Sequence, residues 1–267
     1  MYISYEHQFV QIAVPRTASV SSCAAIRQSD ITHSSDVFYS VPEQQGGEFP
    51  KSDSLLFGRN LSFFVEELGM SQDCLKSQPS YTGNELGKAV SLKLSEELKK
   101  SILLHHLTPS HLLTLGLLTS EQLENFNLFG FVRDPIERWV SRTFLSMQLA
   151  GITENKLEIL TDFIRSGKFS RSDTASNIVA SKMKDYFFHE GTQVVTPYRY
   201  SNMETVVSDF IASKGGTRPD PFPTVGVINV IPEEFRAPVA GWMPSDCLTA
   251  LQEHYAEDIN FYNSVES

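Results

Sequence analysis

Residues 128–144 read LFGFVRDPIERWVSRTF, and they join a short apolar run to a charged corner and then to an amphipathic segment. The apolar run, Leu128 to Val132, is typical of a buried strand, and the segment after it has helical periodicity. Arg133 is left at the carboxyl end of the strand, where open α/β sheets bind ligands. The stretch therefore predicts a strand that leads into a helix, with Arg133 in an anion site at the junction.

The predicted helix has a clear start signal. Asp134 can cap its first turn, and Pro135 suits the first helical position. Glu137, three residues after Asp134, is expected to complete a capping box. The side chains that then share one helical face are Ile136, Val140, Thr143, Phe144 and Met147.

Similar alternation of strand-like and helical segments runs along the whole chain. Strand character is found at residues 9–14, 102–104 and 193–200. Helical periodicity or capping signals are found at residues 24–27, 60–69, 89–100, 109–117, 157–165, 174–182, 201–211 and 245–262, and a capping signal at residues 119–122 indicates the start of a further short helix. Ser201 and Glu204 are expected to form a capping box. Strands that alternate with helices predict an α/β fold with a mostly parallel sheet.

Length and charge limit the class of protein. The 267 residues are 41% hydrophobic, enough for the core of one α/β domain, and we expect a single domain over residues 1–267 with a loop or lid inserted at about residues 29–100. A formal net charge of −10 argues against a protein that wraps nucleic acid or lies on anionic membrane. Any site for phosphate must therefore be local.

The cysteines and the apolar content predict a compartment. Cys23, Cys74 and Cys247 lie far apart, are odd in number and have no metal-ligand spacing, so we expect packed thiols in a reducing environment and no metal site. No segment approaches the roughly 20 apolar residues of a membrane span, and the first residues lack the pattern of a secretory signal. A soluble, cytoplasmic protein is expected.

Two further segments carry candidate functional residues. Residues 14–21, VPRTASVS, follow a predicted strand and precede a predicted helix, a layout that suits a phosphate cradle but equally an ordinary turn. His105 and His106 follow the predicted strand 102–104, and only one of them can face a cleft. A neutral imidazole is a suitable general base at neutral pH, and we favour His106 with His105 in reserve.

Taken together, VPRTASVS, the segment HHLT at residues 105–108 and FGFVRDPIERWVS at residues 129–141 resemble, in order and approximate spacing, the PAPS-dependent sulfotransferases, specifically the carbohydrate (Golgi-type) branch and its bacterial relatives. The resemblance implies a P-loop-like three-layer fold with a central, mostly parallel sheet flanked by helices. It also implies PAPS (3′-phosphoadenosine 5′-phosphosulfate) as donor, PAP as product, a hydroxyl acceptor such as a sugar or small alcohol, and no metal.

The resemblance assigns roles to individual residues. The counterparts of the family's 5′-phosphosulfate loop are Pro15, Arg16, Thr17, Ala18, Ser19, Val20 and Ser21. Arg16 stands where the family usually has lysine, which keeps the charge but replaces a point ammonium with a planar fork. Arg133 and Ser141 correspond to the pair that holds the 3′-phosphate, whereas Arg138 is read as a solvated or structural charge. His106 and Thr108 resemble an H-x-T element.

Two other classes of protein remain open at this point. A P-loop kinase shares the phosphate-cradle geometry, although the Mg²⁺ ligands and the Walker lysine-serine pair that it ordinarily needs are not found in this sequence. A non-catalytic nucleotide- or glycan-binding protein would keep Arg133 and Ser141 without needing a base. None of the three classes is expected to have nucleic acid as a partner.

Overall fold

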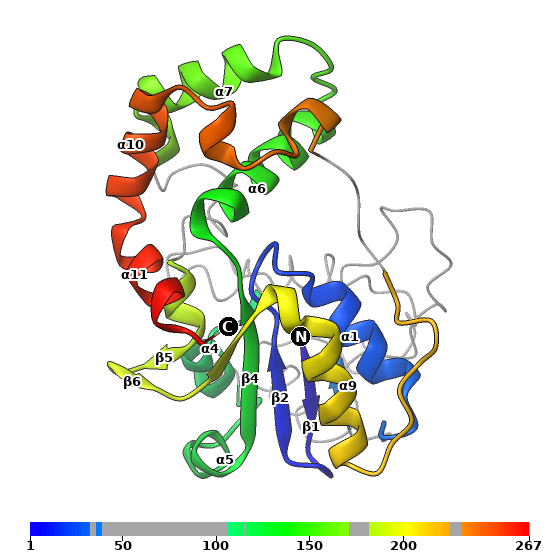
Figure 1. Cartoon of the computed structure of the whole chain (residues 1–267). Helices are drawn as coiled ribbons and strands as arrows, with labels where there is room; N and C mark the ends of the chain where they lie inside the picture. Colours follow the sequence, from blue (N-terminus) through cyan, green and yellow to red (C-terminus); the bar gives the residue numbers. More distant parts are fainter. Residues whose placement is uncertain (33–35, 39–105, 115, 171–181, 225–230, 267) are drawn as a thin grey trace, which may run out of the picture.

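The computed structural model describes residues 1–32, 36–38, 106–114, 116–170, 182–224 and 231–266. These residues form a central, mostly parallel sheet flanked by helices (Figure 1). The predicted insertion at about residues 29–100 lies largely outside the described residues. So do His105, the strand expected at 102–104 and the helices expected at 60–69, 89–100 and 174–182, apart from residue 182.

The described sheet has five strands in the order β3-β1-β2-β4-β7. Their bounds are β1 Tyr2–Ser4, β2 Phe9–Ile12, β3 Val37–Phe38, β4 Asn127–Val132 and β7 Thr196–Arg199. β2, β4 and β7 pair in parallel, whereas β1 is antiparallel to both β2 and β3. Because parallel strands end at one edge of a sheet, the segments that follow β2, β4 and β7 meet at this edge. The strand predicted at residues 128–132 is confirmed.

Both faces of the sheet are buried. Along β4, Leu128 and Val132 belong to one hydrophobic cluster, while Phe129 and Phe131 belong to another. Successive side chains of a strand point to opposite faces, so these two clusters are the cores on the two sides of the sheet. This explains why the strand reads as a continuous apolar run.

Helices cover each face. On the face of Phe129, α1 (Ser19–Gln28) and α9 (Met203–Ser213) pack side by side (Figure 1). On the other face lie α4 (Pro109–Thr114), α5 (Ser120–Asn125) and α11 (Ala256–Ser264). The short hairpin of β5 (Phe188–His189) and β6 (Thr192–Gln193) lies next to α4.

A third core lies beyond the carboxyl edge of the sheet. It is formed by α6 (Pro135–Leu149), α7 (Lys156–Arg165) and α10 (Ser245–His254), which lie together at the top of Figure 1. Since α6 continues directly from β4, it connects this helical core to the sheet.

Within the described residues, no helix has the length and apolar content that a membrane crossing requires. The 3₁₀ segments are η3 Lys168–Ser170, η4 Met183–Tyr186, η5 Tyr200–Asn202, η6 Glu233–Phe235 and η7 Val239–Gly241.

The predicted start of α6 is confirmed in one respect and wrong in another. The Asp134 carboxylate accepts a hydrogen bond of 2.9 Å from the Glu137 amide, and Pro135 occupies the first turn. The Glu137 side chain, however, lies 3.4 Å from the Arg133 guanidinium instead of completing the capping box. A complete capping box is formed on α5, between Thr119 and Gln122.

Three other helix boundaries differ from the prediction. The helix expected from Pro109 to residue 117 ends at Thr114. The capping box expected at Ser201 is replaced by a 3₁₀ turn, and α9 begins at Met203 without a side-chain cap. The single helix expected at residues 245–262 is divided at Tyr255 into α10 and α11. Tyr255 packs in the helical core and Phe261 packs against the sheet, so the bend lets one segment contribute to two cores.

Candidate anion-binding site

The loop between β2 and α1 has an unusual backbone. Arg16 and Ala18 have positive φ values of 65° and 52°, whereas the φ of Thr17 between them is not positive. Successive backbone amides in turn conformations of this kind can form the anion-binding concavities called nests. The Thr17 hydroxyl donates to the Val14 carbonyl at 2.9 Å, which fixes the loop internally.

The loop leads directly into the first turn of α1. Its N-cap residue is Ala18, and no side chain caps the helix. Unpaired amides at a helix start favour an anion. Beneath the loop, the buried Gln11 of β2 donates from Nε2 to the Ser22 hydroxyl at 3.1 Å and accepts from the Cys23 thiol, so strand and helix are tied together.

Arg16 connects this loop to α6. Its Nε and Nη2 atoms donate to the Ser141 hydroxyl oxygen at 3.2 and 2.8 Å. Ser141 is 2% exposed, so the contact lies in the interior of the site. Two residues 125 positions apart in sequence, each from a different predicted phosphate motif, are thus in direct contact.

Two further guanidinium groups, those of Arg133 and Arg142, act on Arg16; we call Arg16, Arg133 and Arg142 the arginine cluster. Burial and then repulsion from Arg133 and Arg142 lower the pKa of Arg16 to about 10, at which it remains charged near neutral pH. Burial also lowers the pKa of Arg142. Among the described residues, an acidic side chain pairs with Arg133, but none forms an ion pair with Arg16 or Arg142. The cluster therefore has an excess of positive charge.

Sequence reasoning missed two members of this site. Arg142 follows Ser141 on α6 and gave no motif signal. Tyr200 directly follows β7 at the carboxyl edge, and its ring centroid lies 5.5 Å from the Arg133 guanidinium carbon. Tyr200 is 38% exposed, so it is accessible from solvent. Its place at the end of a predicted strand was the only signal that could have identified it.

His106 lies beside the same loop. Its Nδ1 atom is 2.6 Å from the carbonyl oxygen of Ala13, three residues before Arg16. A carbonyl oxygen can only accept, so Nδ1 carries the hydrogen and the neutral ring has Nε2 as its basic atom. The ring is half-buried. His105, the reserve candidate, lies outside the described residues.

The other residues predicted for the loop are largely buried within it or at the start of α1. Pro15, Ser19 and Ser21 are buried, and Val20 is half-buried at the start of α1. Three further side chains contribute to folding. The Cys23 and Cys247 thiols are buried as predicted, and Arg138 is fully buried in an ion pair with Asp258, which makes it a structural and not a solvated charge. Cys74 lies outside the described residues.

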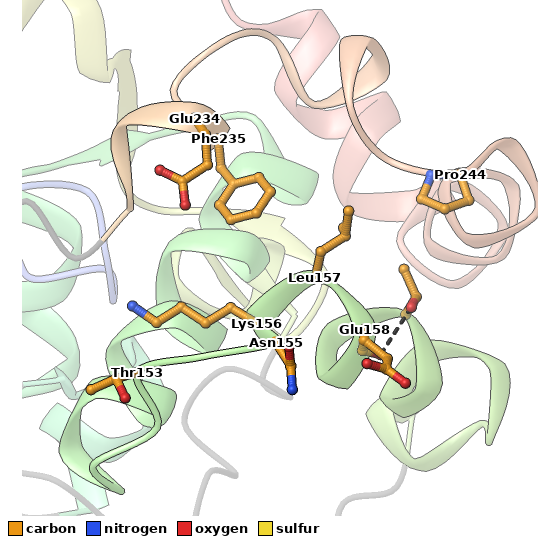
Figure 2. Close-up of a pocket in the computed structure, with 9 residues that line it drawn as sticks. Thr153, Asn155, Lys156, Leu157, Glu158, Glu234, Phe235 and Pro244 are labelled. Carbon is orange, nitrogen blue, oxygen red and sulfur yellow. Dashed lines mark hydrogen bonds between the residues drawn. The ribbon is translucent and has the colours of Figure 1, made fainter.

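A separate pocket of about 590 Å³ opens in the helical core (Figure 2). Figure 2 shows the Phe235 ring directed into it, with Glu234 next to Phe235 and the Lys156 side chain below them. The lining comes from the α6–α7 connection, α7, η6 and the residue before α10. None of the predicted site residues lines this pocket, so it is distinct from the arginine cluster.

The donors of the site suit an anion. Guanidinium groups and backbone amides donate hydrogen bonds, and a serine hydroxyl can donate as well. Within the part of the chain that the structure describes, no group of three or more histidine, cysteine or acidic side chains is arranged to hold a metal ion.

Comparisons with models of protein families, with curated proteins and with solved structures found no match for this chain.

Proposed function

We propose that this protein is a sulfotransferase that moves a sulfuryl group from PAPS to a hydroxyl acceptor, a sugar or a small alcohol, and releases PAP. The observation that carries the proposal is the contact of 2.8 Å between Arg16 and Ser141. It brings a nest-like loop, characteristic of P-loop-like folds, against the helix that begins after Arg133. His106 adjoins the same loop through Ala13.

The geometry suggests how the ligand would be divided between the two segments. The loop amides, the start of α1 and Arg16 would hold the 5′-phosphosulfate, and Arg133 with Ser141 would hold the 3′-phosphate. The contact of Arg16 with Ser141 supports adjacent positions for the two phosphates. A nucleotide with phosphate on both the 3′ and 5′ oxygens meets that requirement.

The reaction is an in-line displacement at sulfur. The acceptor oxygen forms a bond to sulfur as the bond between sulfur and the 5′-phosphate oxygen breaks, and His106 takes the acceptor proton at Nε2. Negative charge grows on the departing phosphate, where Arg16 and the loop amides stabilise it. Preorganised donors of this kind usually supply a large part of the rate enhancement.

The first test is the binding of PAP in the presence of EDTA. We expect calorimetry on the full chain to detect one PAP site that does not change on chelation, because arginine and amide donors hold phosphate without a metal. Transfer from radiolabelled PAPS to a panel of sugars and alcohols, with and without EDTA, then separates the sulfotransferase from a Mg²⁺-dependent kinase. A folded sample that binds no PAP contradicts the proposal.

A second test concerns Arg133 and Ser141. A charge-assisted hydrogen bond is worth about 1.5–3 kcal/mol and a neutral one about 0.5–1.5 kcal/mol, so Arg133→Ala should weaken PAP binding more than Ser141→Ala. Both variants should bind adenosine 5′-phosphosulfate, which lacks the 3′-phosphate, nearly as the wild type does. Dissociation constants for both ligands, with circular dichroism as a folding control, make the comparison. If both ligands weaken by the same factor, Arg133 does not recognise the 3′-phosphate.

A further inference from the structure

Arg142 has a buried donor atom for which the described fold provides no hydrogen-bond partner. Its side chain is half-buried on α6, and its Nε atom is buried without a hydrogen-bond partner among the described residues. A buried donor that is left unpaired costs stability, and a charged one costs more. A bound anion that supplies the missing partner is one explanation of such a cost.

The surroundings of Arg142 indicate which ligand this is. Arg142 follows Ser141, the residue whose hydroxyl accepts from Arg16. Its guanidinium is close enough to Arg16 to lower the pKa of that group, as Arg133 also does. Two of these three cations have no acidic partner within the described chain, and Arg133 pairs with a half-exposed Glu137. An anion with more than one negative charge would relieve this repulsion.

We propose that Arg142 is a third phosphate-binding side chain of this site and contacts the same phosphate as Arg133 and Ser141. This inference rests on the proposed function for the identity of the nucleotide, but not for the chemistry of the anion. A phosphate monoester carries nearly two negative charges at neutral pH. Two guanidinium groups in contact with it, Arg133 and Arg142, with the charge of Arg16 nearby, would favour a terminal phosphate over a diester or an uncharged sugar.

The test compares Arg142→Met with Arg142→Lys and with a matched control, Arg165→Met. Methionine keeps an unbranched apolar stem, lysine keeps the charge, and Arg165 is an exposed arginine paired with Asp246 on another helix. We expect Arg142→Met to weaken PAP binding about tenfold or more, as the loss of a charged hydrogen bond implies, and to leave adenosine 5′-phosphosulfate binding nearly unchanged. Arg142→Lys should recover part of the loss, and Arg165→Met should match the wild type.

Thermal unfolding with inorganic phosphate supplies an independent readout. Without phosphate, Arg142→Met should unfold at or above the wild-type temperature, because it removes an unpaired buried donor; a structural role predicts a lower temperature. Phosphate should raise the unfolding temperature of the wild type and raise that of Arg142→Met less.

The outcomes separate the two proposals. In one outcome, phosphate raises the unfolding temperature of the wild type but not that of Arg142→Met, and neither protein binds PAP. This outcome supports the role of Arg142 and contradicts the sulfotransferase proposal. PAP binding that is equal in wild type and Arg142→Met overturns the role of Arg142 and leaves the sulfotransferase intact. Failure of the wild type to respond to either phosphate or PAP overturns both.

Discussion

Replacement of His106 by alanine is expected to reduce sulfuryl transfer by about 10²–10⁴-fold and to leave PAP affinity nearly unchanged. The Ala13 carbonyl oxygen lies 2.6 Å from Nδ1 of His106 and can only accept, so Nδ1 carries the hydrogen and Nε2 is the basic atom of the neutral ring. A base acts on the acceptor hydroxyl and not on the nucleotide phosphates, so the effect should fall on turnover. Single-turnover transfer from radiolabelled PAPS, together with calorimetry of PAP, measures the two quantities separately.

A second substitution distinguishes a base from a packing residue. In His106→Asn the side-chain amide can still donate to the Ala13 carbonyl, but it has no basic atom. If His106 is the base, the asparagine variant should be as slow as the alanine variant. Recovery of transfer in His106→Asn would show that the hydrogen bond to Ala13 is the important feature and would move the role of base to His105 or another group. His189→Ala, a histidine that contacts Ser110, serves as the control.

Local signals account for what the sequence predicted correctly. The strand at Leu128–Val132, the Asp134 cap and Pro135 in the first turn depend on residues within a few positions of one another. Parallel pairing of β2, β4 and β7 then follows from the alternation of strands and helices, and it brings the ends of these strands to one edge. This pairing explains why the segments after β2 and β4 meet, whereas the assignment of Arg16, Ser141 and His106 to one site came from the resemblance to the sulfotransferases.

The features that the sequence did not predict depend on tertiary contacts. β1 is a three-residue strand that is stabilised by pairing with β2 and β3, and nothing in its own sequence marks it. Glu137 had a local partner in the Asp134 backbone, but the Arg133 guanidinium is the stronger competitor for its carboxylate. Arg142 belongs to no motif, and only its burial and its proximity to Arg16 single it out.

The helix that carries Ser141 and Arg142 also depends on a buried ion pair. Arg138 Nη2 lies 3.5 Å from the Asp258 carboxylate, and both side chains are 1% exposed. The same carboxylate accepts from the Met183 amide at 2.8 Å and from the Lys184 amide at 3.2 Å. Asp258 therefore joins α6, α11 and the 3₁₀ segment η4.

Replacement of Asp258 by alanine is expected to lower the free energy of unfolding by about 3–5 kcal/mol, because it leaves a guanidinium buried without its carboxylate. Asp246→Ala is the matched control: its carboxylate pairs with Arg165 at 2.8 Å, but both side chains are more than half exposed, so solvent screens the pair and the loss should be much smaller than for Asp258→Ala. Urea unfolding followed by circular dichroism measures both. Asp258→Asn keeps an acceptor for the η4 amides and removes the charge, so it reports on the ion pair separately. Equal losses in Asp258→Ala and Asp246→Ala would mean that the buried pair does not hold α6 in place.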